Sequence, residues 1–266
     1  MTRRGAAAIL TAMDNGLFKR GGRSGTTRRT GVAIAVAATL LMILPGAAFA
    51  GYVNYPSFAR TGGLQLNGDA HVVGGALRLT DDYGAASSAF TVPSAIDTTQ
   101  PLHSSFSFWL QDDGGGKADG FTFTIQNDSQ GENAVGAGGG SLGYTGYNGP
   151  PVSIPPITNS VAVAFNIYGG DDIEILKGGD RNAPVEGPQF TSFFGSVHYA
   201  WVDYTPKKKK LKVYVAETNT KPSSPVAQAK IDLKKAIGGA SAHAGFTGGT
   251  GGEYAIQDIL SWKVSN

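Results

Sequence analysis

The chain has 266 residues, of which 41% are hydrophobic and 16% charged, and it contains 39 glycines, 13 prolines and no cysteine. The lack of cysteine excludes disulfides, thiolate metal sites and a cysteine nucleophile. The four histidines show no HxxxH spacing, which excludes a zinc-protease motif. The glycines follow no three-residue period, so the chain is not collagen-like, and it is long enough for one sizeable domain or two small ones.

The first fifty residues differ from the rest in charge. They contain seven lysines and arginines against one acid, Asp14, and lead into the apolar run 31–44. The small-x-small triplet Ala48-Phe49-Ala50 follows. This order predicts a signal peptide over residues 1–50, cleaved after Ala50, and hence a secreted or cell-surface protein. The alternative is a membrane anchor, but a span needs roughly 20 apolar residues and this run is shorter.

The remaining residues, 51–266, carry 15 lysines and arginines against 19 acids, a net charge of −4. A slightly acidic chain does not suit nucleic-acid binding, and no membrane span is expected after cleavage. The one basic run, 207–210, follows Pro206 and precedes the alternating segment 211–215. We interpret it as a solvated hairpin that protects a sheet edge, with a patch for an anionic partner as the alternative.

Hydrophobic and polar residues alternate along several segments, which is the pattern of half-buried β-strands. Segment 105–110 places Phe106, Phe108 and Leu110 on one face, and segments 120–125 and 160–168 repeat the pattern. Many alternating strands separated by turns predict an all-β protein with an antiparallel β-sandwich. The turns are rich in glycine and proline and lie at 112–116, 136–140, 149–156 and 248–252.

Helical periodicity is almost absent from the chain. Only segment 232–237 has the pattern of a helical turn, with Asp232 as its N-cap. Residues 51–266 show neither a change in composition nor an internal repeat. We therefore predict one domain over residues 51–266.

Several short motifs, in a fixed order along residues 58–264, together carry a resemblance to a known family. In this order they resemble the L-type (legume-type) lectin domain. The resemblance implies a jelly-roll sandwich of the concanavalin-like lectin fold that binds glycans without catalysis, and it allows homo-oligomers. The motifs are Phe58 with segments 64–70, 77–80 and 88–90, the A-D-G-F-T-F strand 118–123, the G-G-S-L-G-Y loop 139–144, the strand 160–168, and the closing segments 244–251 and 258–262.

A sugar ring offers hydroxyl groups and one apolar face, and three parts of the chain have matching chemistry. Asp119 can accept charge-assisted hydrogen bonds, Gly139 and Gly140 let the backbone approach a ligand, and Tyr168 offers an aromatic ring. Judged singly, these residues also suit a turn, a loop and strand packing. In the resembled family the residues at these positions contact the sugar. The family's selectivity loop corresponds to residues 248–251, with Gly248, Gly249 and Thr250 as candidate contacts.

The chain departs from the family at the strand that binds metals. Metal-bearing members place Glu, Asp, an aromatic residue and Asn at alternate positions, which share one sheet face. The residues at these positions here are Ala164, Asn166, Tyr168 and Gly170, so both carboxylates are lost. We therefore predict no resident metal or other cofactor, and leave open whether the Ala118-Asp119 peptide is cis, as it is in those members. The alternative is a calcium site rebuilt from Asn166, the Tyr168 carbonyl, Asp171 and Asp172.

Two other functions are compatible with a sandwich of this kind. One is a degenerate lectin-fold surface or adhesion module that binds no sugar. The other is a glycoside hydrolase, since segment 170–174 retains Asp172 and Glu174 of an E-x-D-x-E motif but has glycine in place of the nucleophile. Retaining hydrolysis needs two carboxyl groups about 5 to 5.5 Å apart. We expect a non-catalytic lectin whose partners are glycans.

Overall fold

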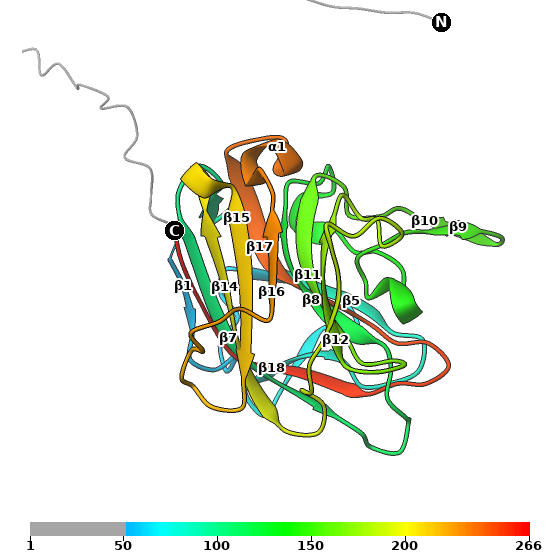
Figure 1. The fold of residues 1–266 in the computed structure, drawn as a ribbon. Coiled ribbons are helices and arrows are strands. Elements are labelled where there is room, and N and C mark those ends of the chain that lie inside the picture. The colour runs from blue at the N-terminus through cyan, green and yellow to red at the C-terminus, as the bar shows by residue number, and fades with distance from the viewer. Residues whose placement is uncertain (1–51) are drawn as a thin grey trace, which may run out of the picture. The chain divides into compact units, whose positions relative to one another are not determined.

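The computed structural model describes residues 52–266, and the predicted signal peptide lies outside the described residues. Two eight-stranded antiparallel sheets face each other (Figure 1). The strand order of the first, called here the β7 sheet, is β16 (Ala227–Lys230), β15 (Lys210–Ala216), β14 (Val197–Thr205), β7 (Leu102–Gln111), β18 (Ile256–Ser265), β4 (Ala76–Thr80) and β3 (His71–Val73), with β1 (Tyr52–Tyr55) paired to β18.

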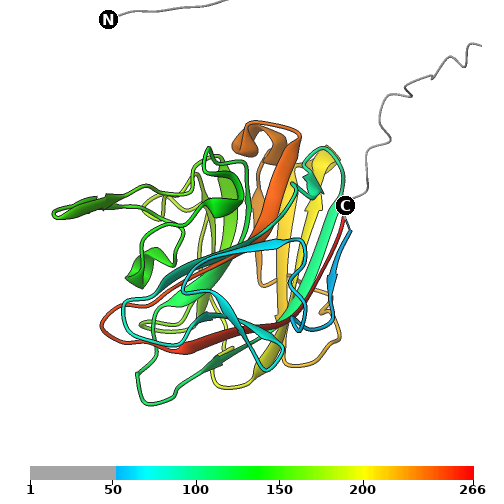
Figure 2. The same ribbon diagram turned by 180° about the vertical axis from the view of Figure 1, so that it is seen from behind.

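The second sheet, called here the β8 sheet, stands beside the first in this view, and a small hairpin projects from the body of the molecule (Figure 2). Its strand order is β13 (Glu186–Phe190), β12 (Asp172–Lys177), β11 (Ser160–Asn166), β8 (Gly120–Gln126), β17 (Ser241–Gly249), β5 (Ala86–Thr91) and β2 (Leu64–Gly68), with β6 (Ile96–Asp97) paired to β17. The hairpin comprises β9 (Tyr147–Gly149) and β10 (Val152–Ile154). The prediction of an antiparallel β-sandwich is confirmed.

The predicted alternation of buried and exposed residues holds along β7. Phe106, Phe108 and Leu110 are buried in the layer between the sheets, while Trp109 is exposed. The Phe106 ring meets rings of the facing β8 sheet, with centroid distances of 5.7 Å to Phe165 and 5.1 Å to Phe246. Each buried aromatic ring removes a large apolar area from water, and its packing geometry is specific. The core therefore fixes how the two sheets sit on each other.

A second, smaller apolar cluster covers the other face of the β8 sheet. It joins residues of the loop after β8 to the outward face of β11 and β12. The Tyr144 hydroxyl lies 2.8 Å from Ser160 Oγ and accepts a hydrogen bond from the Gly179 amide at 3.0 Å. Burial raises the pKa of Tyr144 to about 12, so the phenol stays neutral. The cluster consists of Phe90, Ala134, Leu142, Tyr144, Ile157, Ala162, Ala164 and Leu176.

The helical content is confined to short turns. The helix α1 (Leu233–Ile237) begins at Asp232, whose side chain accepts a hydrogen bond from the Lys235 amide, as predicted. None of the helices described over residues 52–266 is both long and apolar enough to cross a bilayer. The remaining turns are the 3-10 helices η1 (Gly131–Asn133), η2 (Gly139–Ser141) and η3 (Pro206–Lys208).

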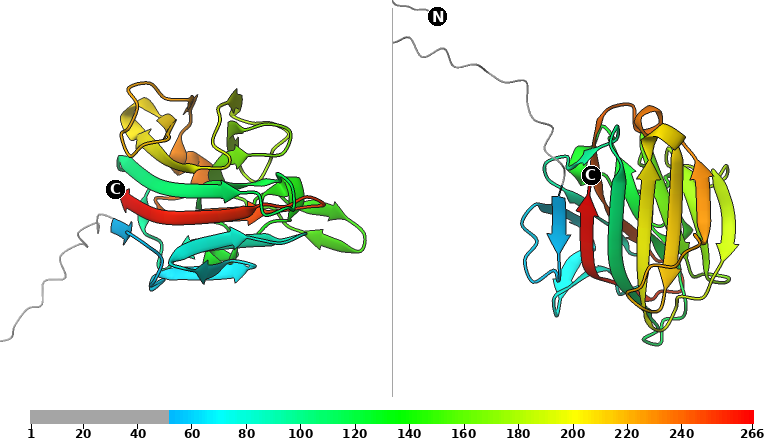
Figure 3. Two further views of the ribbon diagram at one scale, coloured as in Figure 1. Left: turned by 90° about the horizontal axis from the view of Figure 1, so that it is seen from below. Right: turned by 60° about the vertical axis from the view of Figure 1, so that its left-hand side comes forward.

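The lysine run 207–210 forms the turn between β14 and β15, as predicted. Lys209 adopts a left-handed conformation there, and its Nζ lies 2.8 Å from Asp232 Oδ2. The edge-protection part of the prediction is wrong, because β16 pairs with β15 and is itself the edge strand of the β7 sheet (Figure 3, right).

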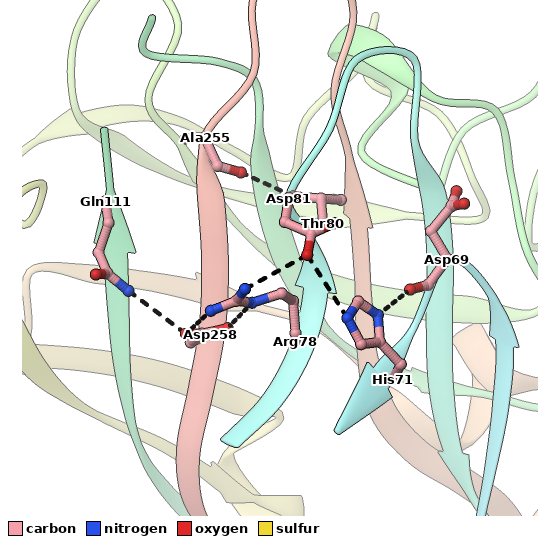
Figure 4. A network of polar contacts seen from close by, with 8 residues as sticks. All are labelled: Asp69, His71, Arg78, Thr80, Asp81, Gln111, Ala255 and Asp258. Carbon is pink, nitrogen blue, oxygen red and sulfur yellow. Dashed lines mark hydrogen bonds and ion pairs between the residues drawn. The ribbon is translucent and has the colours of Figure 1, made fainter. Parts of the chain in front are cut away.

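An ion pair between neighbouring strands fastens β4 to β18 (Figure 4). Arg78 and Asp258 are register partners, and the guanidinium donates two hydrogen bonds to the carboxylate at 2.8 and 2.9 Å. Gln111 of β7 contributes a weaker contact to Asp258 at 3.4 Å. Bidentate pairing holds both position and orientation, so it stabilises the register beside the irregularity between Gln257 and Asp258.

The central position of Phe106 predicts its contribution to stability. Phe106→Ala should lower the free energy of unfolding by about 3 to 5 kcal/mol, because it leaves a cavity between the sheets. The same change at Phe190, which is 75% exposed, should cost less than about 1 kcal/mol. Urea denaturation of the two variants tests this, and equal losses would contradict the assignment of the core.

Candidate functional site

The backbone of Asp119 is clamped between two strands of the β8 sheet. Its amide donates to the Gly249 carbonyl at 3.2 Å, and its carbonyl accepts from the Ile167 amide at 3.0 Å. The peptide bond before it, Ala118-Asp119, is cis. The next residue, Gly120, has a φ of 135°, and a Cβ there would lie 2.1 Å from the Phe165 carbonyl oxygen. Only glycine fits this position, so the backbone that carries the Asp119 side chain is fixed on both sides.

The carboxylate of Asp119 faces a cradle of glycines. A Cβ atom placed on Gly139 or Gly140 would lie 3.9 Å from one of its oxygens, and one placed on Gly251 would lie 3.3 Å away. The Oδ2 atom is buried and has no hydrogen-bond partner among the described residues. Buried polar atoms are almost always paired, and an unpaired one is costly. The arrangement therefore suits a ligand that donates a hydrogen bond to this oxygen.

The surroundings of Asp119 also disfavour its charge. Burial raises the pKa of the carboxyl group, and the Glu253 carboxylate adds to this effect. The Arg181 guanidinium and the nearby Gly251 amide partly offset it. Burial likewise raises the pKa of Asp172, with the neighbouring Glu174 charge acting in the same direction. Acids whose pKa is shifted by burial in a hollow are frequent at functional sites.

Asp119 lies in a pocket of about 300 Å³ at the ends of β11 and β12. Two exposed aromatic side chains also line it: Tyr168 is 62% exposed and Phe190 is 75% exposed. The pocket therefore combines acidic groups with apolar rings. Its lining residues are Asp119, Gly140, Asn166, Tyr168, Gly169, Asp172, Glu174, Arg181, Pro188 and Phe190.

A polar network joins the strands that form the floor of this pocket. The Arg181 Nη2 atom donates to Asn166 Oδ1 at 2.8 Å and to Glu174 Oε2 at 3.1 Å, and Nη1 donates to the Gly140 carbonyl. Asn166 Nδ2 in turn donates to Asp172 Oδ1 at 2.8 Å and to Glu174 Oε2 at 3.0 Å. One guanidinium thus connects β11, β12 and the glycine loop.

The four residues of the alternative calcium site do not form one cluster. Asp171 Oδ2 accepts hydrogen bonds from the amides of Phe193 and Phe194 at 2.9 and 3.0 Å, and Oδ1 forms an ion pair with Lys117. Asn166 presents its amide nitrogen to Asp172, and Tyr168 follows the end of β11. Over residues 52–266 no group of three or more His, Cys, Asp and Glu side chains is arranged to hold a metal ion. These residues do not fit a resident calcium ion.

Of the predicted site residues, the structure brings together Asp119, Gly139, Gly140 and Tyr168. Gly248, Gly249 and Thr250 are buried and do not line the pocket. A Cβ on Gly248 would meet Leu79, and one on Gly249 would meet the Gly139 carbonyl. The Thr250 hydroxyl is fully used, because it accepts from the Ala85 amide at 2.8 Å and donates to the Asp82 carbonyl at 2.6 Å.

Thr250 instead supports the glycine loop from below, since its carbonyl accepts a hydrogen bond from the Gly139 amide at 2.7 Å. The neighbouring Gly251 borders Asp119 in its place. Gly251 belongs to the loop 248–251 that the sequence predicted, whereas Arg181 and Phe190 were not predicted. Arg181 lies in a turn, where the sequence has no hydrophobic periodicity that would mark the residue. Phe190 follows Pro188 by two positions on a short strand and is exposed. An aromatic residue close after a proline is a sequence signal that could have marked it as a surface residue.

Comparison with known proteins connects this geometry to one family. The sequence family described as legume lectin domain matches residues 52–266. Two L-type lectin-domain containing receptor kinases of Arabidopsis thaliana, VIII.1 and VIII.2, are each 27% identical over 227 residues, covering 76% of this chain. The match covers 30% of each kinase, so the chain spans less than a third of the length of these curated relatives.

Solved structures show the same fold at lower identity. The lectin of Bauhinia forficata in complex with GalNAc is 23% identical, with a TM-score of 0.63 over 80% of this chain and 96% of that one. Arcelin-5, a lectin-like defense protein of Phaseolus vulgaris, is 21% identical, with a TM-score of 0.65 over 80% of this chain and 96% of that one.

The raised pKa of Asp119 predicts a cost in stability at neutral pH. A carboxyl group whose pKa is raised by folding stabilises the fold fully below its unfolded pKa, and this contribution is lost as the pH rises through the folded pKa. Asp119→Asn removes the buried charge, so its melting temperature should equal or exceed that of the wild type at about pH 7. The difference should vanish at about pH 3, where both forms are largely neutral.

Asp232 provides a control of opposite sign. The hydrogen bond from Lys209 lowers the pKa of Asp232, so Asp232→Asn should lower the melting temperature at neutral pH. Thermal unfolding across this pH range measures both variants. A melting temperature of Asp119→Asn clearly below that of the wild type at neutral pH would show that the carboxylate is structural.

Proposed function

We propose that this chain, which belongs to the legume lectin domain family, binds glycans reversibly through the Asp119 pocket and converts none of them. The observation that carries the proposal is the Asp119 carboxylate, which lines a pocket with two exposed aromatic rings and whose buried Oδ2 atom lacks a partner among the described residues. A sugar hydroxyl would satisfy that oxygen, and its apolar face suits a ring.

The remaining contacts follow from the geometry of the pocket. Gly139 and Gly140 keep the space beside the carboxylate free of side chains. The Gly140 amide lies in the first turn of η2, where amides have no partner within the helix, and it can donate to a second hydroxyl. Tyr168 and Phe190 supply the ring contacts. A shallow site of this size suits one sugar unit at roughly millimolar affinity, so several copies or a polymeric glycan would be needed for tight binding.

Export is part of the proposal. Its support is the basic leader with an apolar run over residues 1–50, and the absence of cysteine, which makes folding independent of the redox compartment. Glycans of cell surfaces or matrices are the ligands that an exported lectin would meet.

Glycoside hydrolysis is the second candidate, because the pocket also holds Asp172 and Glu174. Both carboxylates accept hydrogen bonds from the single Asn166 amide, and Glu174 also pairs with Arg181. These contacts occupy the two groups with structural partners, which favours binding over catalysis. Release of reducing sugar from β-glucans that is lost in Glu174→Gln would establish the hydrolase instead.

A glycan array followed by calorimetry on the best ligand tests the binding proposal. Asp119→Asn should weaken binding at least about tenfold, because a hydrogen bond to a charged acceptor is worth about 1.5 to 3 kcal/mol. Asp203→Asn, an acid on the outer face of the β7 sheet, should bind as the wild type does. If the wild type binds no glycan, the chain is the degenerate structural module.

The aromatic contact is tested separately. Tyr168→Ala should weaken binding about three- to tenfold, because a ring contact of this kind contributes about 0.5 to 1.5 kcal/mol. Tyr52→Ala is the matched control, since Tyr52 is equally exposed but lies on β1 of the other sheet. Equal affinities of the Tyr168 and Tyr52 variants, measured by calorimetry, would remove Tyr168 from the site.

A further inference from the structure

The floor of the pocket is a concentration of oxygen atoms and negative charge. Asp119, Asp172 and Glu174 contribute three carboxylates, and the Asn166 side chain and the Gly140 backbone contribute carbonyl oxygens. Among the residues that line the pocket, Arg181 carries the one positive charge. Clustered carboxylates repel one another and need a cation nearby to stay ionised.

The guanidinium of Arg181 already contacts three of these five groups. It donates to Asn166 Oδ1 at 2.8 Å, to Glu174 Oε2 at 3.1 Å and to the Gly140 carbonyl. These are the kinds of ligand that a calcium ion takes in proteins, namely carboxylate, amide and backbone oxygens. The guanidinium also joins β11, β12 and η2, which are the three elements that a shared cation would hold together.

Two further contacts exclude a metal ion from the same place. Asn166 presents its NH2 group, a donor, to both Asp172 and Glu174, so a cation between them would meet N–H groups. Ala164, two residues earlier on β11, lies fully buried in the apolar cluster with Leu142 and Tyr144. A carboxylate or a metal ion at that position would have to be desolvated without a polar partner, which is strongly unfavourable.

We propose that Arg181 takes the place of a divalent cation in this pocket and positions the Gly139–Gly140 loop and Asn166 beside Asp119, so that ligand binding needs no metal. The proposal rests on the proposed glycan function for its ligand, but not for its statement about metals. Arginine remains charged at all physiological pH values and is tethered to the chain, so its occupancy is independent of metal supply. Arg181 is a positioning residue, acting through the loop and through the charge that it places near Asp119.

The first test requires no sugar. Calcium and manganese are titrated into the full protein by calorimetry, and thermal unfolding is recorded with and without EDTA. The proposal predicts no saturable heat and no shift in melting temperature beyond about 1 °C, because a ligand specific for the native state would raise it. Saturable binding of either ion with a raised melting temperature would overturn the proposal.

The second test follows the charge of Arg181 in variants. Arg181→Gln retains a planar donor group without charge, and Arg181→Lys retains the charge without the fork. Arg60→Gln, at an exposed position away from the pocket, is the matched control. Carbon NMR of the aspartate carboxyl groups should show that Arg181→Gln raises the pKa of Asp119 further, because the cation that opposes the effect of burial is gone. In Arg60→Gln and Arg181→Lys the pKa of Asp119 should stay close to its value in the wild type, because the positive charge near Asp119 is retained.

Sugar affinity completes the test and separates the two proposals. Arg181→Gln should bind the array-selected glycan at least about tenfold more weakly than the wild type, while EDTA leaves the wild type unchanged. Wild-type affinity in Arg181→Gln, or loss of wild-type binding in EDTA, would overturn the role of Arg181. If no glycan binds the wild type, the proposed function fails, and the metal and carboxyl titrations still decide the role of Arg181. If Arg181→Gln does not fold, Arg181→Lys carries the affinity comparison, with weaker binding expected because lysine cannot span the three acceptors.

Discussion

The arrangement of the pocket depends on one constraint, which is that the Asp119 carboxylate is held half-buried and its Oδ2 atom has no hydrogen-bond partner within residues 52–266. Its backbone is bonded to Gly249 on one side and Ile167 on the other, and Gly120 leaves no freedom at the start of β8. The backbone of Asp119 is therefore fixed, and its side chain leaves the sheet edge at a defined position beside the glycine loop. Burying this carboxylate lowers the free energy of unfolding, and the rest of the fold offsets that loss. Binding sites commonly reduce stability in this way.

The sandwich provides the rigidity that this constraint needs. Interlocked rings such as Phe106 and Phe246 fix one sheet on the other, and a second cluster that includes Tyr144 holds the glycine loop over β11. The pocket then forms where β11 ends and β12 begins, next to that loop. Polar side chains placed on strand ends of a rigid sheet are positioned more precisely than side chains on free loops. Arg181 adds a link between strands and loop that apolar packing alone does not supply.

Much of this arrangement could be predicted from sequence. Alternation placed Phe106, Phe108 and Leu110 in the core, because the side-chain period of a strand is a local signal. The order of the motifs placed Asp119 near Gly139 and Gly140, because the fold family fixes how these segments meet. Burial of Thr250 could not be predicted, since the glycines around it indicate an open loop and its partners come from segment 82–85. Nor could the role of Arg181, because a charged residue in a turn has no periodicity, and its acceptors belong to other strands.

The role of Asp119 is tested most directly by a crystal structure of the protein grown without metal ions and bound to its best glycan. We predict a sugar hydroxyl at about 2.5 to 2.7 Å from Asp119 Oδ2. The sugar ring should lie against Tyr168, and the Arg181 guanidinium should remain on Asn166 and Glu174. A glycan bound at another surface, with that oxygen still lacking a ligand, would contradict the account.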